Sequence, residues 1–492
     1  MPKPLNVLLI TTDQQRGDCL GVDGHPVLRT PHLDALATRE GGAFFTAAYA
    51  EAPACVPQRT AWMLGQHPLT CGQNEWRGQV WNTAQTLTGA FAEQGHYVGV
   101  FGKRHFHPVR EPYGAHEFKI YESGRNGEEP DDFLQYLRKE TEWGGYSRGH
   151  GIGNNDIFAA PSVLPEEHHP STWTARESLA FLDRHARQRS GQPFFLWTSF
   201  NKPHSPYDPP EPYHRLYRPQ DVPGPSWAAR LEDEIEPARR MARHYTWHTL
   251  GEEQVRVTRS YYYGLIAHID ACVGRLLAKL DELGLRENTV IAFTSDHGDL
   301  MGDHHMYFKS NFFEGSTRVP YIWWVPPSRR AELGLSAQGR IAAPVGVSTL
   351  GPSLFELAGS RAPAGADAGS VVPMLRGEHD PAKHEVAAAY SNATAHSAML
   401  RWDRWKYLFW QCGGIRQLFD LQTDPGEMNN LAEHPEHRER AREAHARLEQ
   451  RLAGYTFGRS EVLDAAGKLV AHPVPPANHK PPIKGPWGRR EN

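Results

Sequence analysis

The stretch NVLLITTDQQ, residues 6–15, joins an almost continuous apolar run to an acid and two amides. An apolar run of this length is typical of a strand that is buried on both faces, as in the centre of a parallel sheet. Ligands of open parallel sheets bind outside the carboxyl ends of the strands. We therefore expect Asp13 and Gln14 to lie at a functional edge of a sheet.

The same pattern recurs three times along the chain. The runs at 96–101, 193–200 and 288–293 are apolar, and they are followed by GKRHFH, NKPHSPY and TSDHGD. Because the carboxyl ends of parallel strands share one edge, the polar residues after all four strands should converge. The convergent set is Asp13, Gln14, Lys103, His105, His204, Asp296 and His297.

Helical stretches separate these strands. In TPHLDALATREGG, residues 30–42, Thr30 can cap a helix, Pro31 suits its first position and Gly41 can end it. Helices are also predicted at 86–95, 171–185 and 260–284 from their periodicity. This alternation predicts an α/β fold, a large mixed, mostly parallel sheet flanked by helices on both faces.

The character of the chain changes after about Gly377. Residues 398–410 and 415–424 read as antiparallel strands, and 435–454 as a charged surface helix. We expect a large domain over 1–377, a small C-terminal α+β domain over 378–465, and a Pro-rich extended tail over 466–492.

Composition excludes several classes of protein. The chain has 492 residues, 39% of them hydrophobic and 22% charged, as in soluble globular proteins. Its net charge of −4 gives no reason to expect nucleic acid or an anionic membrane as a partner. The N-terminal apolar run has no small-residue cleavage site, so we expect a cytoplasmic location. Five scattered cysteines argue against a disulfide framework.

The convergent residues indicate a chemistry. Asp13, Gln14 and Asp296 offer oxygen ligands and His297 a nitrogen, a set that suits a divalent cation. Lys103, His105 and His204 supply positive charge and protons, which together with a cation favour a tetrahedral oxyanion. Each residue alone could be a helix cap or a hydrogen-bonded surface group. Four strand ends with the same property make that explanation weak.

Two further features leave alternatives open. Lys309 follows Asp296 by thirteen residues, so its loop could fold back over the site or leave an exposed lysine. Trp76 and Trp81 could stack on a substrate or belong to the core.

Cys55 lies in EAPACVPQRTAWML, residues 51–64. Pro57 can begin a helix, which places Cys55 at a helix N-terminus, where backbone N–H groups favour an oxyanion. Arg59 lies one turn further on the same side. Taken alone, Cys55 could be a buried structural thiol or a thiolate nucleophile.

The pattern C-x-P-x-R followed by a helix resembles the maturation signature of type I sulfatases, a family of the alkaline phosphatase superfamily. NVLLITTDQQRGD, GKRHF, the segment from TSDHGD to Lys309, and LFDLQTDPGEMNNLA resemble other segments of that family. The resemblance covers nearly the whole chain. It implies an alkaline-phosphatase-like fold and an enzyme, a sulfuric ester hydrolase.

The resemblance also implies a mechanism. In that family a formylglycine-generating or equivalent maturation enzyme oxidises the cysteine to formylglycine, and the hydrate of this aldehyde attacks sulfur. The divalent metal would be calcium, with manganese or magnesium as alternatives. The implied metal ligands are Asp13, Gln14, Asp296, His297 and the modified Cys55. Arg59 and Lys103 would hold the hydrate, His105 would act as its base, and His204 and Lys309 would bind sulfate and assist the leaving oxygen.

The expected reaction is hydrolysis of a small organic or sugar sulfate ester to an alcohol and sulfate. Gln14 departs from the second Asp of many members, and Gln58 from their Ser or Ala. A phosphonate monoester or phosphodiester hydrolase of the same superfamily is one alternative. A non-catalytic binder of sulfated ligands, with Cys55 unmodified, is another. The Pro-rich tail and the aromatic C-terminal strands also suggest a homo-oligomer.

Overall fold

The structure is a computed structural model. It describes residues 4–76, 78–123, 131–144, 147–380, 383–391, 396–455 and 462–474. Residues 475–492 of the predicted tail lie outside the described residues.

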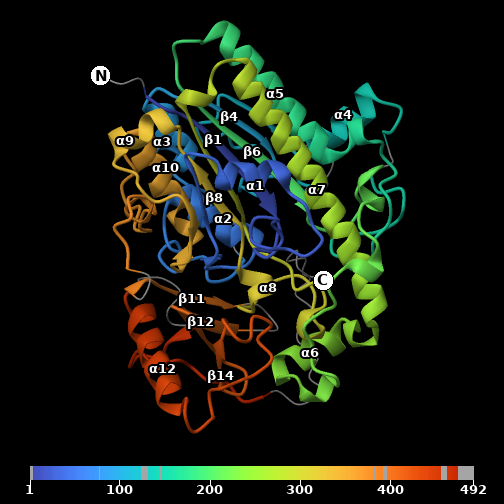
Figure 1. The fold of residues 1–492 in the computed structure, drawn as a ribbon, viewed down its shortest axis with the longest axis vertical. Helices are drawn as coiled ribbons and strands as arrows, with labels where there is room; N and C mark the ends of the chain where they lie inside the picture. Colours follow the sequence, from blue (N-terminus) through green and yellow to red (C-terminus); the bar gives the residue numbers. More distant parts are fainter. Residues whose placement is uncertain are drawn as a thin grey trace.

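An eight-stranded sheet forms the centre of the molecule (Figure 1). Its strand order is β5-β4-β6-β1-β7-β8-β2-β9. Strand β8 runs antiparallel to both of its neighbours, and the other pairs are parallel. The predicted mixed, mostly parallel sheet is therefore confirmed. The bounds are β1 Asn6–Asp13, β2 Gly42–Phe45, β4 Tyr97–Gly102, β5 Glu117–Ile120, β6 Phe194–Pro203, β7 Thr289–Ser295, β8 Tyr321–Trp324 and β9 Gly339–Ile341.

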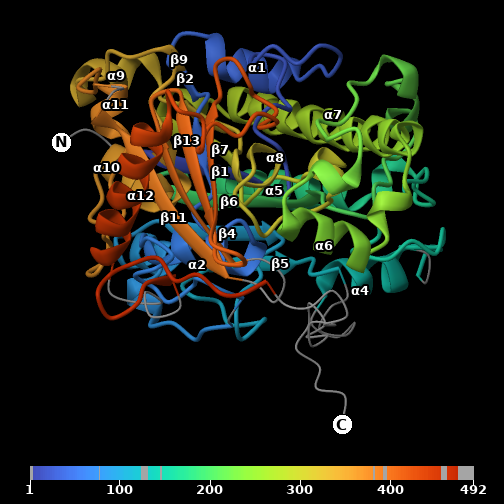
Figure 2. The same ribbon diagram turned by 90° about the horizontal axis from the view of Figure 1, so that it is seen from below.

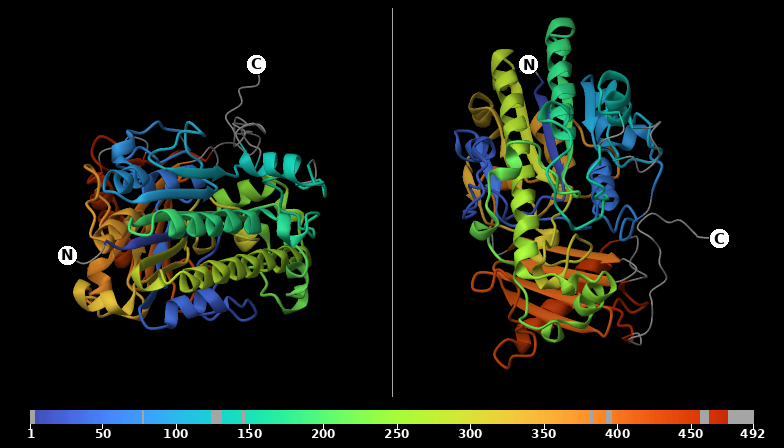
Figure 3. Two further views of the ribbon diagram at one scale, coloured as in Figure 1. Left: turned by 90° about the horizontal axis from the view of Figure 1, so that it is seen from above. Right: turned by 90° about the vertical axis from the view of Figure 1, so that its right-hand side faces the viewer.

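Strand β1 lies between β6 and β7 and is completely buried, as its sequence predicted. Because successive side chains of a strand point to opposite faces, β1 contributes to two cores. Leu8 and Ile10 pack on one face with three helices, α1 (Pro31–Thr38), α5 (Pro170–Gln188) and α7 (Glu252–Glu282). Val7 and Leu9 pack on the other face with α2 (Cys55–Leu64), α3 (Leu87–Glu93), α10 (Leu350–Ala358) and α11 (Val372–Leu375). Figure 3 shows α5 and α7 running side by side.

The helices that cover the large sheet come from both halves of the chain. Their bounds are α1 Pro31–Thr38, α2 Cys55–Leu64, α3 Leu87–Glu93, α5 Pro170–Gln188, α7 Glu252–Glu282, α9 Pro327–Leu333, α10 Leu350–Ala358 and α11 Val372–Leu375. Three shorter helices belong to the connecting segments: α4 Asp132–Glu140, α6 Glu236–His244 and α8 Glu314–Thr317.

A second sheet of four antiparallel strands, in the order β11-β12-β13-β14, packs against helix α12 (Figure 2). Its bounds are β11 Glu385–Ser391, β12 His396–Trp402, β13 Trp405–Trp410, β14 Ile415–Asp420 and α12 Arg438–Ala453. The predicted antiparallel strands and helix are confirmed. The domain boundary at 377/378 stays a prediction. A two-stranded ladder of β3 (Ala48–Tyr49) and β10 (Val345–Gly346) completes the described strands.

Several predicted element bounds differ from the structure. Helix α7 begins at Glu252, eight residues before the predicted start, and α1 ends at Thr38 rather than near Gly41. Thr30 is the N-cap residue of α1, but its side chain makes no capping hydrogen bond. Its hydroxyl instead donates to Asp34 Oδ1 over 2.8 Å. Helix α2 begins at Cys55, two residues before Pro57.

Candidate active site

The residues that follow the four parallel strands lie at one edge of the sheet. Asp13 ends β1, and Asp296 directly follows β7, its neighbour in the sheet. Lys103 follows β4, and its backbone N–H donates to Ser199 O of β6 over 2.8 Å. His204 follows the end of β6. All four side chains are buried.

Four ligand-bearing side chains gather at this edge. The ligand atoms of Asp13, Cys55, Asp296 and His297 all lie within 4.8 Å of one another, and all four residues are buried. His297 Nδ1 donates to Gly298 O over 2.9 Å, which leaves Nε2 facing the cluster. That atom lies 3.5 Å from Asp13 Oδ1 and 3.6 Å from Asp296 Oδ1. Two carboxylates and an imidazole are donors that suit a divalent cation.

Cys55 is the first residue of α2 and is only 1% exposed. Its Sγ lies 3.2 Å from His297 Nε2 and 3.6 Å from Asp13 Oδ1. Burial and the Asp13 carboxylate raise the pKa of the thiol, but Lys103, Lys309 and His297 outweigh them and bring it to about 7. A thiol in this setting lies among cationic groups, as reactive cysteines do and structural ones do not.

Arg59, one turn along α2, reaches across the sheet edge. Its Nε donates to Asp296 Oδ2 over 2.7 Å, and both side chains are fully buried. Nη1 donates to Lys103 O and to Ser199 Oγ, each over 2.9 Å. Nη2 is buried and has no hydrogen-bond partner among the described residues. A buried guanidinium N–H of this kind is a donor suited to an oxyanion.

Lys103 forms a completely buried ion pair with Asp13 through Nζ and Oδ2. Burial alone would raise the pKa of Asp13, but Lys103, with His204 and Lys309, holds it well below its usual range. Burial would also lower the pKa of His297, yet the Asp296 carboxylate raises it. The site therefore balances carboxylates against cations at short range.

Gln14 and Lys309 contact each other, and the charge of Lys309 lies close enough to act on Asp13 and Cys55. Lys309 Nζ donates to Gln14 Oε1 over 2.6 Å and lies 3.1 Å from His204 Nε2. The loop that follows Asp296 thus folds back over the site. His204 Nδ1 donates to Ser205 O over 2.9 Å, so Nε2 is the atom that faces the lysine.

His105 and Trp76 contact each other, whereas Trp81 lies elsewhere. His105 Nε2 lies 3.5 Å from Glu122 Oε2, and its ring stands edge-on to Trp76 at a centroid distance of 5.5 Å. Trp76 is 39% exposed, so its ring is open to a ligand beside His105. Trp81 packs against Phe106 in the core.

Sequence reasoning missed two contributions to this site. Asp299 accepts a hydrogen bond from Gln14 Nε2 over 2.6 Å, although only its place in TSDHGD pointed to it. The C-terminal sheet also reaches the neighbourhood of the site: Tyr390 of β11 packs in one apolar cluster with Ala52 and Ala54. Burial raises the pKa of Tyr390, and Cys55 raises it further.

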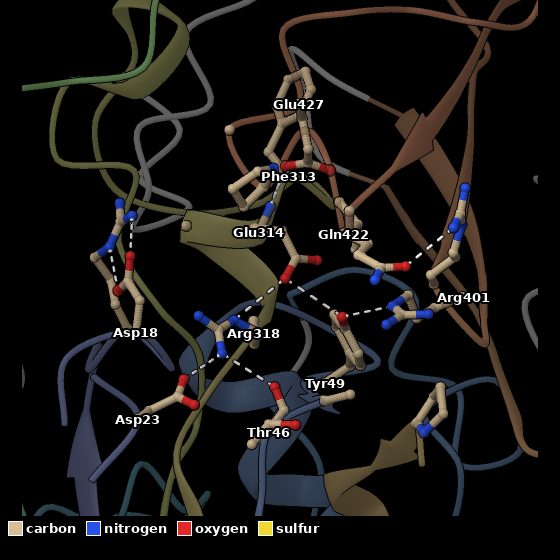
Figure 4. Close-up of a pocket in the computed structure, with 18 of the residues that line it drawn as sticks. Asp18, Asp23, Thr46, Tyr49, Phe313, Glu314, Arg318, Arg401, Gln422 and Glu427 are labelled. Atoms are coloured by element: carbon tan, nitrogen blue, oxygen red, sulfur yellow. Dashed lines mark hydrogen bonds and ion pairs between the residues drawn. The ribbon is translucent and has the colours of Figure 1, made fainter. Parts of the chain in front are cut away.

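A separate polar cavity of about 730 Å³ lies between β3, α8 and the C-terminal sheet (Figure 4). The residues that line it include none of the predicted metal ligands. Several of its charged side chains pair with each other. Arg318 binds Asp23 over 2.9 Å, and Glu314 lies 3.4 Å from the Tyr49 hydroxyl. The cavity therefore belongs to the contact between the two sheets and is distinct from the Cys55 site.

No helix among the described residues is long and apolar enough to cross a membrane.

Comparisons with known proteins agree with the geometry. The family model named Sulfatase matches residues 5–360, and the one for the N-sulphoglucosamine sulphohydrolase C-terminus matches residues 302–453. An arylsulfatase of Clostridium perfringens is 31% identical over 92% of this chain and 96% of its own length. A choline-sulfatase of Rhizobium meliloti is 31% identical over 87% of this chain and 83% of its own length. The crystal structure of the phosphonate monoester hydrolase of Agrobacterium radiobacter matches with a TM-score of 0.73 and 25% identity, over 92% of this chain and 96% of that one.

Proposed function

The chain belongs to the sulfatase family, and we propose that it hydrolyses a small organic or sugar sulfate ester through a formylglycine made from Cys55. The observation that carries this proposal is the position of Cys55. It is the first residue of α2, buried, and adjacent to the His297 imidazole and the Asp13 carboxylate. A formylglycine at this position would supply, as its hydrate, the oxygen nucleophile for attack on sulfur.

The residues around Cys55 fit such a group. Arg59 holds a buried Nη2 that has no partner among the described residues, and this N–H would donate to an oxygen on the converted side chain. Lys103 lies near the same thiol, because its Nζ pairs with Asp13 Oδ2 and the other oxygen of that carboxylate lies 3.6 Å from Cys55 Sγ. Two fixed cationic donors in a buried site stabilise developing negative charge without reorganisation. We propose that Arg59 and Lys103 hold the nucleophile in place.

The proposed reaction also uses a divalent cation. Asp13, Asp296, His297 and Gln14, together with the converted Cys55, would hold it. It would supply Lewis acidity toward a sulfate oxygen. Four of these five positions offer oxygen donors once Cys55 is converted, which favours calcium, with manganese and magnesium as alternatives.

We propose that Lys309 and His204 bind the sulfate and assist the departure of the alcohol. Lys309 Nζ and His204 Nε2 lie 3.1 Å apart, so one sulfate ester oxygen can contact both. We assign the peripheral sulfate oxygens to Lys309 and the proton for the leaving oxygen to His204. His105, whose Nε2 faces Glu122, is assigned as the base that later deprotonates the nucleophile.

The organic part of the substrate would lie beside Trp76. This ring is 39% exposed and stands next to His105, so it offers an apolar face to an aryl, sugar or ammonium group. The relatives named arylsulfatase and choline-sulfatase support small organic esters as the first candidates.

The direct test is sulfate release from 4-nitrophenyl sulfate and from choline sulfate by protein co-expressed with a formylglycine-generating enzyme. We expect turnover in the wild type and a loss of at least about 10³-fold in Cys55→Ala, because the nucleophile is gone. Equal rates for both proteins would contradict the proposal.

A second candidate is hydrolysis of phosphonate monoesters. The fold match to a phosphonate monoester hydrolase favours it, as does a 29% identical relative named as a multifunctional alkaline phosphatase superfamily protein. Measuring kcat/KM for 4-nitrophenyl sulfate and for a 4-nitrophenyl phosphonate monoester decides between the two functions. We expect the sulfate ester to be preferred. Cytoplasmic location and a homo-oligomeric state stay predictions.

A further inference from the structure

Asp299 follows the metal-ligand candidate Asp296 by three residues, and its carboxylate contacts the side chain of Gln14. Its Oδ2 accepts from Gln14 Nε2 over 2.6 Å and from the Tyr207 hydroxyl over 2.6 Å. Its Oδ1 accepts from the backbone N–H groups of Met301 and Phe308 over 3.0 and 2.7 Å. The carboxylate is completely buried and therefore has a fixed set of four donors.

Gln14 is held equally firmly by its backbone. Its N–H donates to Asp296 Oδ1 over 3.1 Å, and its carbonyl accepts from the Tyr262 hydroxyl over 2.6 Å. Its φ of 75° lies in the left-handed region, which is unusual for a residue other than glycine. These contacts fix the backbone of Gln14 and therefore the position of its Cα and Cβ atoms. They do not fix which end of its amide points to which neighbour.

The amide of a glutamine has one acceptor end and one donor end, and these exchange when the group flips. In this structure Nε2 faces the Asp299 carboxylate and Oε1 faces the Lys309 ammonium. The flipped amide would set Nε2 against an ammonium and Oε1 against a carboxylate, and both contacts would be repulsive. Asp299 and Lys309 therefore select one orientation of the amide.

We infer that Asp299 is a positioning residue that keeps the Gln14 amide oxygen, and not its nitrogen, directed toward Lys309 and the divalent cation. This rests on the cation site of the proposed function. Only the oxygen end can serve as a metal ligand, so a free flip would turn Gln14 into a repulsive neighbour half of the time. The contact between Gln14 and Asp299 also places a negative charge next to Gln14, which is itself a neutral ligand.

The pairing makes a prediction for exchanged residues. In Gln14→Glu alone, which keeps the length of the side chain, two carboxylates face each other inside a buried site, and the donor to Asp299 is lost. In Asp299→Asn alone, the new amide can meet either end of the Gln14 amide, so only Lys309 still favours the orientation with Oε1 toward the cation and the flipped state gains population. When both substitutions are combined, the new amide at position 299 can donate to the new carboxylate at position 14. That carboxylate has oxygens at both ends, and the exchanged pair carries the same total charge as the wild-type pair.

The experiment is a double-mutant cycle on full-length protein, read in two ways. Calcium affinity is measured by calorimetry on metal-stripped samples, and the thermal midpoint is measured on the metal-free proteins. We expect each single variant to lose about 10–100-fold in calcium affinity and to unfold at a lower temperature. The double variant should recover both. Tyr207→Phe is the matched control. It removes a different donor to Asp299 and should leave calcium affinity unchanged.

Losses that add in the double variant would overturn the inference, because they would show that Asp299 only braces the Met301–Phe308 loop. The same holds if Asp299→Asn leaves calcium affinity at the wild-type value. A wild type that binds no calcium, but whose metal-free midpoints still show recovery in the double variant, would overturn the proposed cation site. It would leave the pairing of Asp299 with Gln14 supported.

Discussion

Arg59 Nε donates to Asp296 Oδ2 over 2.7 Å, and both side chains are fully buried. This bond ties the first turn of α2, which begins at Cys55, to the end of β7. It couples the helix of the proposed nucleophile to the edge of the sheet that carries the proposed metal ligands, so a change on either side should affect the other.

Two substitutions of Arg59 distinguish the effect of its positive charge from the effect of its hydrogen-bond geometry. Arg59→Ala leaves a buried carboxylate without its cation and should cost about 3–5 kcal/mol of stability. Arg59→Lys keeps the charge but cannot reach Asp296, Lys103 and Ser199 together. We expect Arg59→Lys to fold and to lose about 10²-fold in kcat. Urea unfolding and steady-state kinetics measure the two effects. A fully active Arg59→Lys would rule out the assigned role.

Lys309 and His204 should behave as a unit. Lys309→Ala removes the proposed donor to the sulfate oxygens, and we expect about 10²–10³-fold lower kcat/KM. His204→Ala should cost a similar factor, and the double variant little more, since the two act on the same group. The matched control is Lys119→Ala, because Lys119 pairs with Glu177 and its side chain is half exposed. Independent, multiplying losses would contradict a shared role.

Removal of the metal should abolish activity and lower stability. We expect incubation with a chelator to abolish sulfate release, and calcium to restore it. A ligand at 100 times its Kd stabilises a protein by about 2.7 kcal/mol, so the thermal midpoint should rise measurably when calcium is added back. Parallel titrations with manganese and magnesium rank the alternatives. Full activity after dialysis against chelator would argue against a catalytic cation.

Glu51, four residues before Cys55, predicts a pH dependence of stability. Burial raises its pKa from 4.5 to about 7, although Ser348 N donates to Oε2 over 3.0 Å. Between these values the folded protein keeps a proton that the unfolded chain has lost. Stability therefore falls as pH rises from about 4.5 to about 7, by roughly 3 kcal/mol from this group.

The measurement is urea unfolding at several pH values for wild type and Glu51→Gln. The amide is neutral throughout, so the difference between the two proteins should change across that window and stay flat above it. A constant difference across the whole window would show that Glu51 ionises normally in the folded state.

A buried lysine links the C-terminal sheet to helix α8 and should contribute strongly to stability. Lys406 of β13 is fully buried and lies 2.8 Å from Glu314 Oε1 of α8 and 2.9 Å from Glu427 Oε1. Lys406→Met leaves the buried Glu427 carboxylate without its lysine, while Glu314 keeps Arg318 at 3.3 Å, and we expect a loss of about 3–5 kcal/mol. The exposed pair Arg230–Asp233 provides the control, since Arg230→Ala should leave stability nearly unchanged. Equal effects would contradict the buried pair's role.

The sequence predicted the parts of the fold that have a clear hydrophobic pattern. The four parallel strands were predicted because each is a continuous apolar run, and β1, β6 and β7 are completely buried. The start of α7 was not predicted, because residues 252–259 carry charges and little apolar periodicity. This first part of α7 instead carries ion pairs along the helix, such as that of Glu252 with Arg256 at 2.6 Å.

Strand β11 was missed for a related reason. Its sequence, EVAAAYS, is rich in alanine, which favours helices and shows no alternation. Only its pairing with β12 makes it a strand. The sequence predicted that the strand ends converge, but not which side chains bond to each other there. The bonds of Arg59 to Asp296 and of Gln14 to Asp299 span 237 and 285 residues, and no local pattern predicts such individual partners.

The central claim is that Cys55 is the precursor of the nucleophile. The most direct measurement is the mass of the tryptic peptide Glu40–Arg59, from protein co-expressed with a formylglycine-generating enzyme. We predict the mass of the aldehyde at position 55, and a further shift when the peptide reacts with a hydrazide reagent. An unmodified thiol in a protein that still hydrolyses sulfate esters would contradict the account.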